Sequence, residues 1–272
     1  MAYAPDVNIN CDMAENFGVY EIGNDDALLS IIGSANVACG FHAGDPTVMR
    51  DFAKKAKNAS VSIGAHPGFL DLQGFGRRPI VMSGDDIETM VAYQIGSLQA
   101  LAQYASLTVT HIKPHGALAN MAAEDRTYAD AIARAVKTVD DRLIYIALHG
   151  SEMHHAAEAA GLRFAREGYA DRRYGDDGNL ASRQSAGAVI TSPDAAMLQA
   201  VRMARDGEIE TVTGKILHVE IDTVCIHGDQ PNAVPITQAV RNGLEVAGLN
   251  TVPLDQLARF KSTTQEQVNH AA

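Results

Sequence analysis

The chain has 272 residues, of which 46% are hydrophobic and 20% are charged, and its formal net charge is −11. This composition is typical of a globular protein and excludes a disordered or fibrous chain. The acidic balance argues against a nucleic-acid partner, because phosphate contacts need clustered Lys and Arg residues. Small molecules are the expected ligands, and an anionic one needs local basic residues to overcome the negative field of the protein.

The chain carries three cysteines and no apolar run long enough to cross a membrane. This odd number, without a signal peptide, predicts a reduced cytoplasmic protein that has no membrane partner. Cys11, Cys39 and Cys225 lie in apolar runs typical of strands, where a free cysteine usually acts as a small hydrophobic residue. We therefore favour burial over a nucleophilic role for all three.

Short apolar runs alternate with longer amphipathic stretches along the chain. This alternation is the pattern of repeated βα units around a mainly parallel sheet. The strands are predicted at Val7–Cys11, Ala35–Gly40, Val61–Ala65, Thr108–Lys113, Leu143–Leu148, Arg163–Glu167, Ala188–Thr191 and Thr223–Ile226. Because no linker-like composition interrupts the sequence, residues 1–272 are expected to form a single α/β domain, and a β/α barrel has this size.

Capping signals mark the starts of four helices between these strands. The expected helices are Thr47–Asn58 after Asp45-Pro46, Ile87–Tyr104 after Ser83 and Asp86, a helix from Ser151 to Gly161, and Asp194–Arg205 after Ser192-Pro193. Around Thr213-Gly214, the range Ile209–Thr223 breaks into short alternating pieces that predict a small β excursion. The polar tail after Phe260 is expected to fray.

Titratable side chains recur where the predicted strands end. Ligands of parallel α/β folds bind at the carboxyl ends of the strands, because loops and helix N-termini converge there. Taken singly, each residue has a structural explanation, such as a helix cap for Asp45 or a surface ion pair for Asp171 with Arg172. Their recurrence at one structural position favours a shared site. The residues are Asp12, His42, Asp45, His66, Lys113, His115, Glu167, Asp171, Arg172, His227 and Asp229.

Two hydrolytic reaction classes fit this set of side chains. A metal hydrolase needs about three ligands and one position open to water, and Asp12, His42 and His66 are candidate ligands. A metal-free hydrolase would use a carboxylate or His as the base for water, with Lys113 or an Arg stabilising the developing oxyanion. The spacing of the residues does not decide between these classes.

Adjacent arginines end the loop that follows the third predicted strand. Arg77 and Arg78 are suited to binding a carboxylate or phosphate in forked geometry. A serine hydrolase is disfavoured because the sequence has no Gly-x-Ser-x-Gly elbow. A dinucleotide enzyme is disfavoured because no predicted strand runs into Gly-x-Gly-x-x-Gly.

Six long motifs stand in order along the sequence. They are Asn10–Met13, Ser34–Pro46, Ile63–Gly68 with Gly74–Arg78, His111–Leu118, Glu167–Arg172 with Tyr174, and Asp222–Asp229. Together they resemble the LamB/YcsF family, the A subunit of bacterial 5-oxoprolinase, over nearly the whole chain up to about Gly248. Long motifs in a fixed order are more specific than any single short signature.

The resemblance implies a distorted seven-stranded β/α barrel akin to the polysaccharide deacetylase and glycoside hydrolase architecture. It also implies ATP-dependent opening of the lactam 5-oxoproline (pyroglutamate) to L-glutamate, with Mg²⁺ accompanying the ATP and subunits B and C as partners. An amide is a poor electrophile, so phosphorylation of its oxygen prepares it for attack by water. Substrate and phosphate are then expected at Asp45, Arg77, Arg78, Arg172 and Asp229.

Proton transfer is assigned on this interpretation to Asp12 or His42. The other catalytic candidates shape and charge the same pocket, and they are His66, Lys113, His115, Glu167, Asp171 and His227. Two alternatives stay open: a substrate-binding subunit without chemistry of its own, and a metal-dependent deacetylase-like hydrolase of carbohydrate or amide substrates. The sequence also leaves open whether a metal is bound and whether the chain forms a homo-oligomer.

Three positions depart from the family pattern. Ala14 stands where the family usually has Gly, Ala119 where it usually has Tyr, and His149 where Pro is common. These departures concern the details of the pocket and the choice of substrate, while the His and Asp residues at the strand ends are intact.

Overall fold

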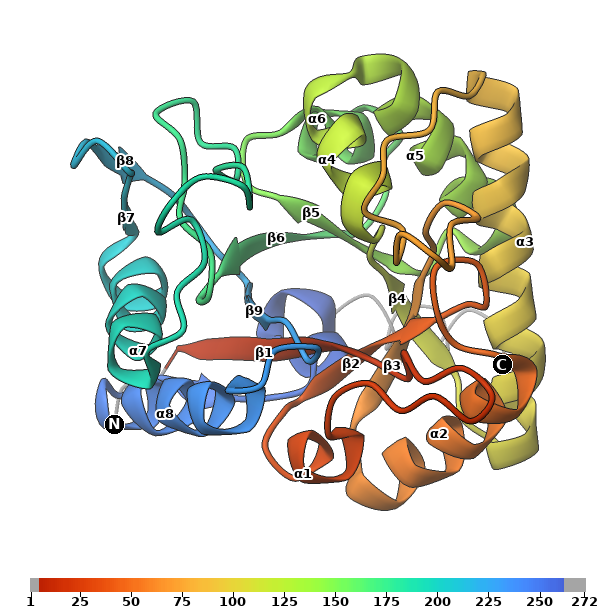
Figure 1. Ribbon diagram of the computed structural model, residues 1–272, viewed down its shortest axis with the longest axis horizontal. Helices are drawn as coiled ribbons and strands as arrows, with labels where there is room; N and C mark the ends of the chain where they lie inside the picture. Colours follow the sequence, from red (N-terminus) through yellow and green to blue (C-terminus); the bar gives the residue numbers. More distant parts are fainter. Residues whose placement is uncertain (1–4, 262–272) are drawn as a thin grey trace.

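Seven parallel strands form a closed barrel in this protein. The computed structural model describes residues 5–261, and Figure 1 shows the strands at its centre with helices around them. The strands follow the order β1-β2-β3-β4-β5-β6-β9, and β9 pairs back with β1 to close the sheet. They are β1 (Asp6–Met13), β2 (Ser34–Ala38), β3 (Ser62–His66), β4 (Val109–Ile112), β5 (Ile144–Leu148), β6 (Phe164–Tyr169) and β9 (Thr223–Ile226). This closure confirms the predicted seven-stranded β/α barrel.

Eight α-helices are present among the described residues. They are α1 (Asp25–Leu29), α2 (Pro46–Ala59), α3 (Gly84–Ala102), α4 (Gly116–Glu124), α5 (Arg126–Asp140), α6 (Glu152–Ala159), α7 (Pro193–Val201) and α8 (Ala233–Val246). The four helices with capping signals are confirmed, since Asp45, Ser83, Ser151 and Ser192 each accept a hydrogen bond from the first turn of a helix. No helix in residues 5–261 is both long and apolar enough to span a bilayer.

The short elements complete the fold and correct one predicted strand. The β excursion is confirmed as an antiparallel hairpin of β7 (Glu208–Glu210) and β8 (Ile216–His218). In Figure 1 it lies at the margin beside the segment that follows β6, and Val212 N donates to Tyr174 O there (2.9 Å). The predicted strand Ala188–Thr191 is wrong, because β9 occupies the edge of β6 and leaves this stretch only an isolated bridge to Arg172.

The remaining pieces lie near the ends of longer elements. They are η1 (Gln103–Ala105) after α3, a π-helical turn η2 (Arg202–Asp206) after α7, the strand β10 (Asn250–Thr251) parallel to the start of β1, and η3 (Leu254–Gln256). The fraying predicted after Phe260 concerns residues 262–272, which lie outside the described residues.

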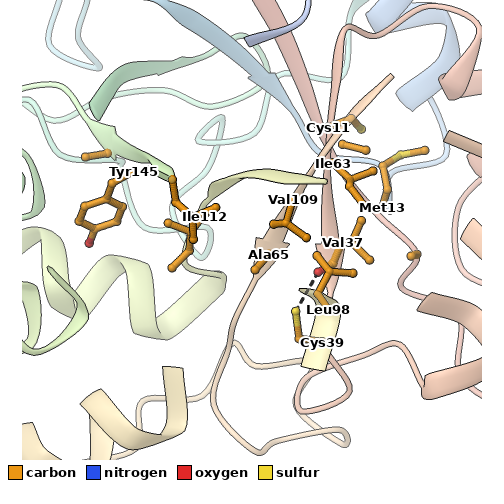
Figure 2. Close-up of a cluster of buried hydrophobic side chains, with 14 of the residues drawn as sticks. Cys11, Met13, Val37, Cys39, Ile63, Ala65, Leu98, Val109, Ile112 and Tyr145 are labelled. Atoms are coloured by element: carbon orange, nitrogen blue, oxygen red, sulfur yellow. Dashed lines mark hydrogen bonds between the residues drawn. The ribbon is translucent and has the colours of Figure 1, made fainter. Parts of the chain in front are cut away.

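An apolar layer fills the space between the strands and the helices. Figure 2 shows part of it, with Val37, Cys39 and Leu98 close together and Cys39 Sγ donating to Val37 O (3.2 Å). Burial raises the pKa of the Cys39 thiol to about 12, which keeps it protonated and unreactive. Cys11 and Cys225 are also fully buried. The predicted burial of all three cysteines is therefore confirmed.

The inner face of the barrel is polar, in contrast to this apolar layer. Side chains alternate between the two faces of a strand, so Asn8, Asn10 and Asp12 of β1 share the inner face. Asn8 Nδ2 donates to Ser34 Oγ (3.0 Å), and Asn10 Nδ2 donates across the barrel to Glu167 Oε1 (3.1 Å). A column of buried polar groups thus runs up the barrel toward the carboxyl ends of the strands.

Candidate active site

Hydrogen bonds tie the middle of the polar column to the residues at its top. Asn36 Nδ2 donates to Asn10 Oδ1 (2.7 Å) and to Asp12 Oδ1 (2.9 Å). The ring of His111 lies 3.2 Å from Asn36 through Nε2. Gly64 makes room for this ring, because a Cβ atom at that position would lie 2.1 Å from the imidazole. These contacts fix the position of the Asp12 carboxylate from below.

Lys113 is the charged centre of the site and is only 2% exposed. Its Nζ lies 3.0 Å from Asp12 Oδ1, 3.1 Å from Glu167 Oε1 and 2.8 Å from Cys225 Sγ. Burial alone would lower the pKa of Lys113, but Asp12 and the other nearby groups raise it well above its usual value. Burial likewise raises the pKa of Asp12, but His66 and Lys113 hold it well below its usual range. Both groups are therefore charged.

Four buried side chains at the top of the barrel converge on one point. They are Glu15, His42, His66 and His115, and one nitrogen or oxygen from each lies within 4.8 Å of the others. His66 Nδ1 donates to Lys113 O (2.6 Å), and His115 Nε2 donates to Phe75 O (2.8 Å). In neutral rings these bonds leave lone pairs on His66 Nε2 and His115 Nδ1, which lie 3.0 Å apart.

Two members of this cluster lack partners for their polar atoms. Glu15 Oε1 and both ring nitrogens of His42 are buried without a hydrogen bond, although Glu15 Oε1 lies 3.4 Å from His42 Nε2. Burial and the charge of Asp12 raise the pKa of Glu15, while burial and His66 lower the pKa of His42. Buried polar groups without partners are costly. A bound cation would satisfy them, and imidazole nitrogen with carboxylate oxygen is a typical zinc ligand set.

A cavity of about 620 Å³ opens beside these groups. Its lining includes Asp12, His66, Lys113, His115 and His227 from the carboxyl ends of four strands. With Arg172, six of the predicted strand-end residues line this cavity, whereas Asp45, Glu167, Asp171 and Asp229 do not. His42 is absent from the lining; its ring instead stacks on that of His115, with the centroids 3.7 Å apart.

A second titratable pair joins the segments that follow β6 and β9, and its His227 lines the cavity. The Nδ1 atom of His227 lies 2.8 Å from Asp171 Oδ2, and the backbone nitrogen of His227 donates to the same oxygen (3.1 Å). Burial raises the pKa of Asp171, but the neighbouring His227 outweighs this effect and lowers it below its usual value. The Asp171 carboxylate thus assigns the proton to Nδ1 and leaves Nε2 of a neutral His227 free to accept one.

The predicted anion-binding residues divide into two groups. Arg77 and Arg172 line the cavity, and Arg77 Nη2 forms an ion pair with Asp229 Oδ2 (2.8 Å). Asp45 and Arg78 lie outside it. Asp45 caps α2, whereas the Arg78 side chain is 63% exposed and pairs with Asp71. We therefore assign no ligand-binding role to Asp45 or Arg78, in contrast to the prediction from sequence.

Several site residues were absent from the sequence prediction. Glu15 lies two residues beyond the end of β1, on the loop, and Tyr169 lies at the end of β6 with the Lys113 ammonium 5.1 Å from its ring centre. Asn36 and His111 lie within strands. For His111 the available signal was parity, because it lies two positions before Lys113 at the end of β4.

The departures from the family pattern fall in three different environments. Ala14 has a φ of 57°, which is in the left-handed region, and this explains why Gly is usual there. Ala119 lines the cavity, so the small side chain leaves space that a Tyr would fill. His149 lines a neighbouring cavity of about 580 Å³.

The backbone of Ala14 is held by a carboxylate whose titration affects stability. Ala14 N donates to Asp25 Oδ2 (3.0 Å), and burial, partly opposed by this bond and by Lys55, raises the pKa of Asp25 from 3.8 to about 6. Between these pH values the folded protein keeps a proton that the unfolded chain has lost. Stability therefore falls as the pH rises through this window, and it stays reduced above it.

Asp25→Asn is expected to raise the free energy of unfolding at about pH 7 by about 1–2 kcal/mol, with little gain at about pH 4. The amide oxygen still accepts the bond from Ala14 N, while the cost of burying a charge is removed. Urea unfolding at the two pH values measures the difference. Asp26→Asn, in the same turn but exposed, is the control. Equal stability of Asp25→Asn and wild type at both pH values would refute the prediction.

Comparison with known proteins places this site in a family. The sequence model of the LamB/YcsF family matches residues 7–259. The A subunit of 5-oxoprolinase from Rhodopseudomonas palustris is 51% identical over 91% of this chain and 98% of that protein, and its namesake from Natranaerobius thermophilus is 46% identical over 91% and 96%. The crystal structure of the lactam utilization protein from Thermus thermophilus has a TM-score of 0.86 and 41% identity, over 91% of this chain and 99% of that one. The chain belongs to the LamB/YcsF family.

Proposed function

We propose that this protein is the A subunit of a 5-oxoprolinase, a single-domain cytoplasmic subunit that works with subunits B and C to hydrolyse 5-oxoproline to L-glutamate using ATP with Mg²⁺. The names of the relatives suggest the substrate. The observation that carries the proposal is the buried, charged Asp12–Lys113–Glu167 group beside a cavity that also contains arginines. Such a site can bind an acidic lactam and activate water next to it.

The reaction that we propose proceeds through an activated amide. Transfer of the terminal phosphoryl group of ATP to the lactam oxygen makes the lactam carbonyl carbon electrophilic. One water adds to that carbon, the ring C–N bond breaks, and the nitrogen gains a proton. A second water then hydrolyses the resulting acyl phosphate, so that the products are L-glutamate, ADP and phosphate.

Asp12 is the proposed base for the attacking water. It lines the cavity, and its pairing with Lys113 keeps it ionised. The three ammonium protons of Lys113 have Asp12, Glu167 and Cys225 as acceptors, so none is left for an oxyanion. We therefore propose that Lys113 positions the two carboxylates.

His227 is the group that we propose to exchange a proton with the lactam nitrogen. Its Nδ1 is held by Asp171, and its Nε2 is free to exchange a proton with the lactam nitrogen. Arg77 and Arg172, which line the same cavity, are the proposed ligands for the carboxylate and phosphate groups.

Substitution of the two proton-transfer groups tests this assignment. Asp12→Asn and His227→Gln are each expected to lower turnover of 5-oxoproline in the reconstituted three-subunit enzyme by about 10²–10⁴-fold. Asp194→Asn removes an exposed carboxylate at the start of α7 and is expected to leave turnover unchanged. If both site variants turned over as fast as wild type, these roles would be wrong.

A metal-dependent amide hydrolase is a second candidate, favoured by the cluster of Glu15, His42, His66 and His115. These four residues would hold the metal, and a bound divalent ion would supply Lewis acidity toward water or a carbonyl. Asp12 lies 3.4 Å from His66 Nε2 through Oδ2, so its carboxylate would lie beside the metal ligands as a base for water.

A further inference from the structure

Three guanidinium groups line the cavity, and among the described residues one of them forms an ion pair. Arg77 pairs with Asp229 at 2.8 Å. Arg172 and Arg183 also line the cavity, and within residues 5–261 neither forms an ion pair with a carboxylate. In a chain whose net charge is −11, two arginines that line one cavity without a direct ion pair are unusual.

Arg172 is a buried cation with an unused donor. Its side chain comes from the segment after β6 and is only 4% exposed. Nη2 donates to Ala181 O (2.6 Å), whereas Nε is buried without a partner. The adjacent Asp171 carboxylate favours the charged form of Arg172 only through space, because its oxygens accept hydrogen bonds from His227 and from Gln230 Nε2 (2.7 Å). An unsatisfied buried guanidinium is costly unless a ligand completes it.

Arg183 lies on the same segment and shares the field of the other two arginines. Burial and then the charge of Arg77 lower the pKa of Arg183, and burial and then the charge of Arg183 lower the pKa of Arg172. Arg183 therefore lies close enough to both Arg77 and Arg172 for their charges to repel. A bound anion would reverse this repulsion, and guanidinium groups match the geometry of carboxylate and phosphoryl oxygens.

We propose that Arg172 and Arg183 form an oxyanion subsite that receives a carboxylate or phosphoryl group of the ligand. The inference deepens the proposed function, because 5-oxoproline carries a carboxylate and its activated form carries a phosphoryl group as well. Arg183 is then a specificity-determining residue that no strand-end pattern reveals. An anionic lactam is bound here, and a neutral lactam of the same ring size is rejected.

Calorimetric titration of the isolated full-length chain tests the subsite without any turnover. The probes are inorganic phosphate, 5-oxoproline and the neutral lactam 2-pyrrolidinone. Wild type is expected to bind at least one of the two anions more tightly than 2-pyrrolidinone. Preference for phosphate identifies a phosphoryl subsite, and preference for 5-oxoproline identifies a carboxylate subsite. Arg183→Gln is expected to weaken binding of that anion by about tenfold to hundredfold.

Two further variants keep the result interpretable. Arg183→Lys retains the charge without the forked geometry, so an intermediate affinity is expected. Arg173→Gln removes the same charge from the same segment, but its side chain does not line the cavity, and wild-type affinity is expected. The subsite is refuted if neither anion binds better than 2-pyrrolidinone, or if a folded Arg183→Gln binds like wild type. Because turnover is not measured, loss of the proposed lactamase activity in the reconstituted enzyme is a separate result.

Discussion

Lys113→Met is expected to abolish turnover and to lower the free energy of unfolding by about 3–5 kcal/mol. The substitution removes the only ammonium group between the carboxylates of Asp12 and Glu167, which lie 3.0 and 3.1 Å from Nζ. Methionine fills a similar volume, so little cavity is created. The loss of stability therefore comes mainly from the uncompensated charge of the buried carboxylates. Chemical denaturation measures the stability, and the reconstituted enzyme measures the turnover.

Two further variants separate the effect of Lys113 on stability from its effect on turnover. Lys55→Met breaks the exposed ion pair with Asp26 and is expected to cost at most about 1 kcal/mol. Adding Asp12→Asn and Glu167→Gln to Lys113→Met removes the unpaired charges, so stability is expected to recover in part while turnover stays lost. A Lys113→Met protein as stable as wild type would show that the buried ion pair contributes nothing.

The barrel could be predicted from the sequence because its signals are local. Alternation of apolar and polar residues, caps such as Ser83 and breaks such as Gly207 act within one or two turns of the chain. Closure of the sheet, in contrast, depends on pairing between strands that lie far apart in the sequence. The stretch 188–191 has a strand-like composition, but it lies outside the barrel because β9 occupies that edge of β6. No pattern within the stretch itself reveals this.

Position at a strand end predicted some of the residues that line the cavity, but it did not predict their roles. Asp12, His66 and Lys113 meet at the cavity as expected. Asp45 has the same position in sequence, yet its oxygens accept from Gly18, Thr47 and Val48, which makes it a cap and a loop anchor. Glu15 was missed because a loop with one left-handed residue, Ala14, turns it back toward the cluster.

Because the loop at Ala14 brings Glu15 to the cluster, the structure indicates other metal ligands than the sequence did. The sequence suggested Asp12, His42 and His66, whereas the structure groups His42 and His66 with Glu15 and His115. Oδ1 of Asp12 instead contacts Lys113 and Asn36, while its Oδ2 lies 3.4 Å from His66 Nε2. The two sets make different predictions, because only in the second does Glu15 bind the ion directly.

One divalent metal ion per chain is therefore expected in protein purified without chelator, and Glu15→Gln and His42→Ala are each expected to lose it. Elemental analysis measures the metal content. Addition of Zn²⁺ to the metal-free wild type is expected to raise its melting temperature, because a ligand bound only by the folded state stabilises it by about 4 kcal/mol at a thousandfold excess over Kd. His155→Ala, an exposed histidine on α6, is the control and is expected to keep the metal.

Asp12→Asn decides between the two ligand sets. If the four-residue cluster holds the ion, this variant keeps its metal and loses turnover, because Asp12 acts on water and Glu15 on the ion. If Asp12→Asn loses the metal while Glu15→Gln keeps it, the set predicted from sequence is correct. Substoichiometric metal in wild type, with no shift in melting temperature on adding Zn²⁺, would refute metal binding by the cluster of Glu15, His42, His66 and His115.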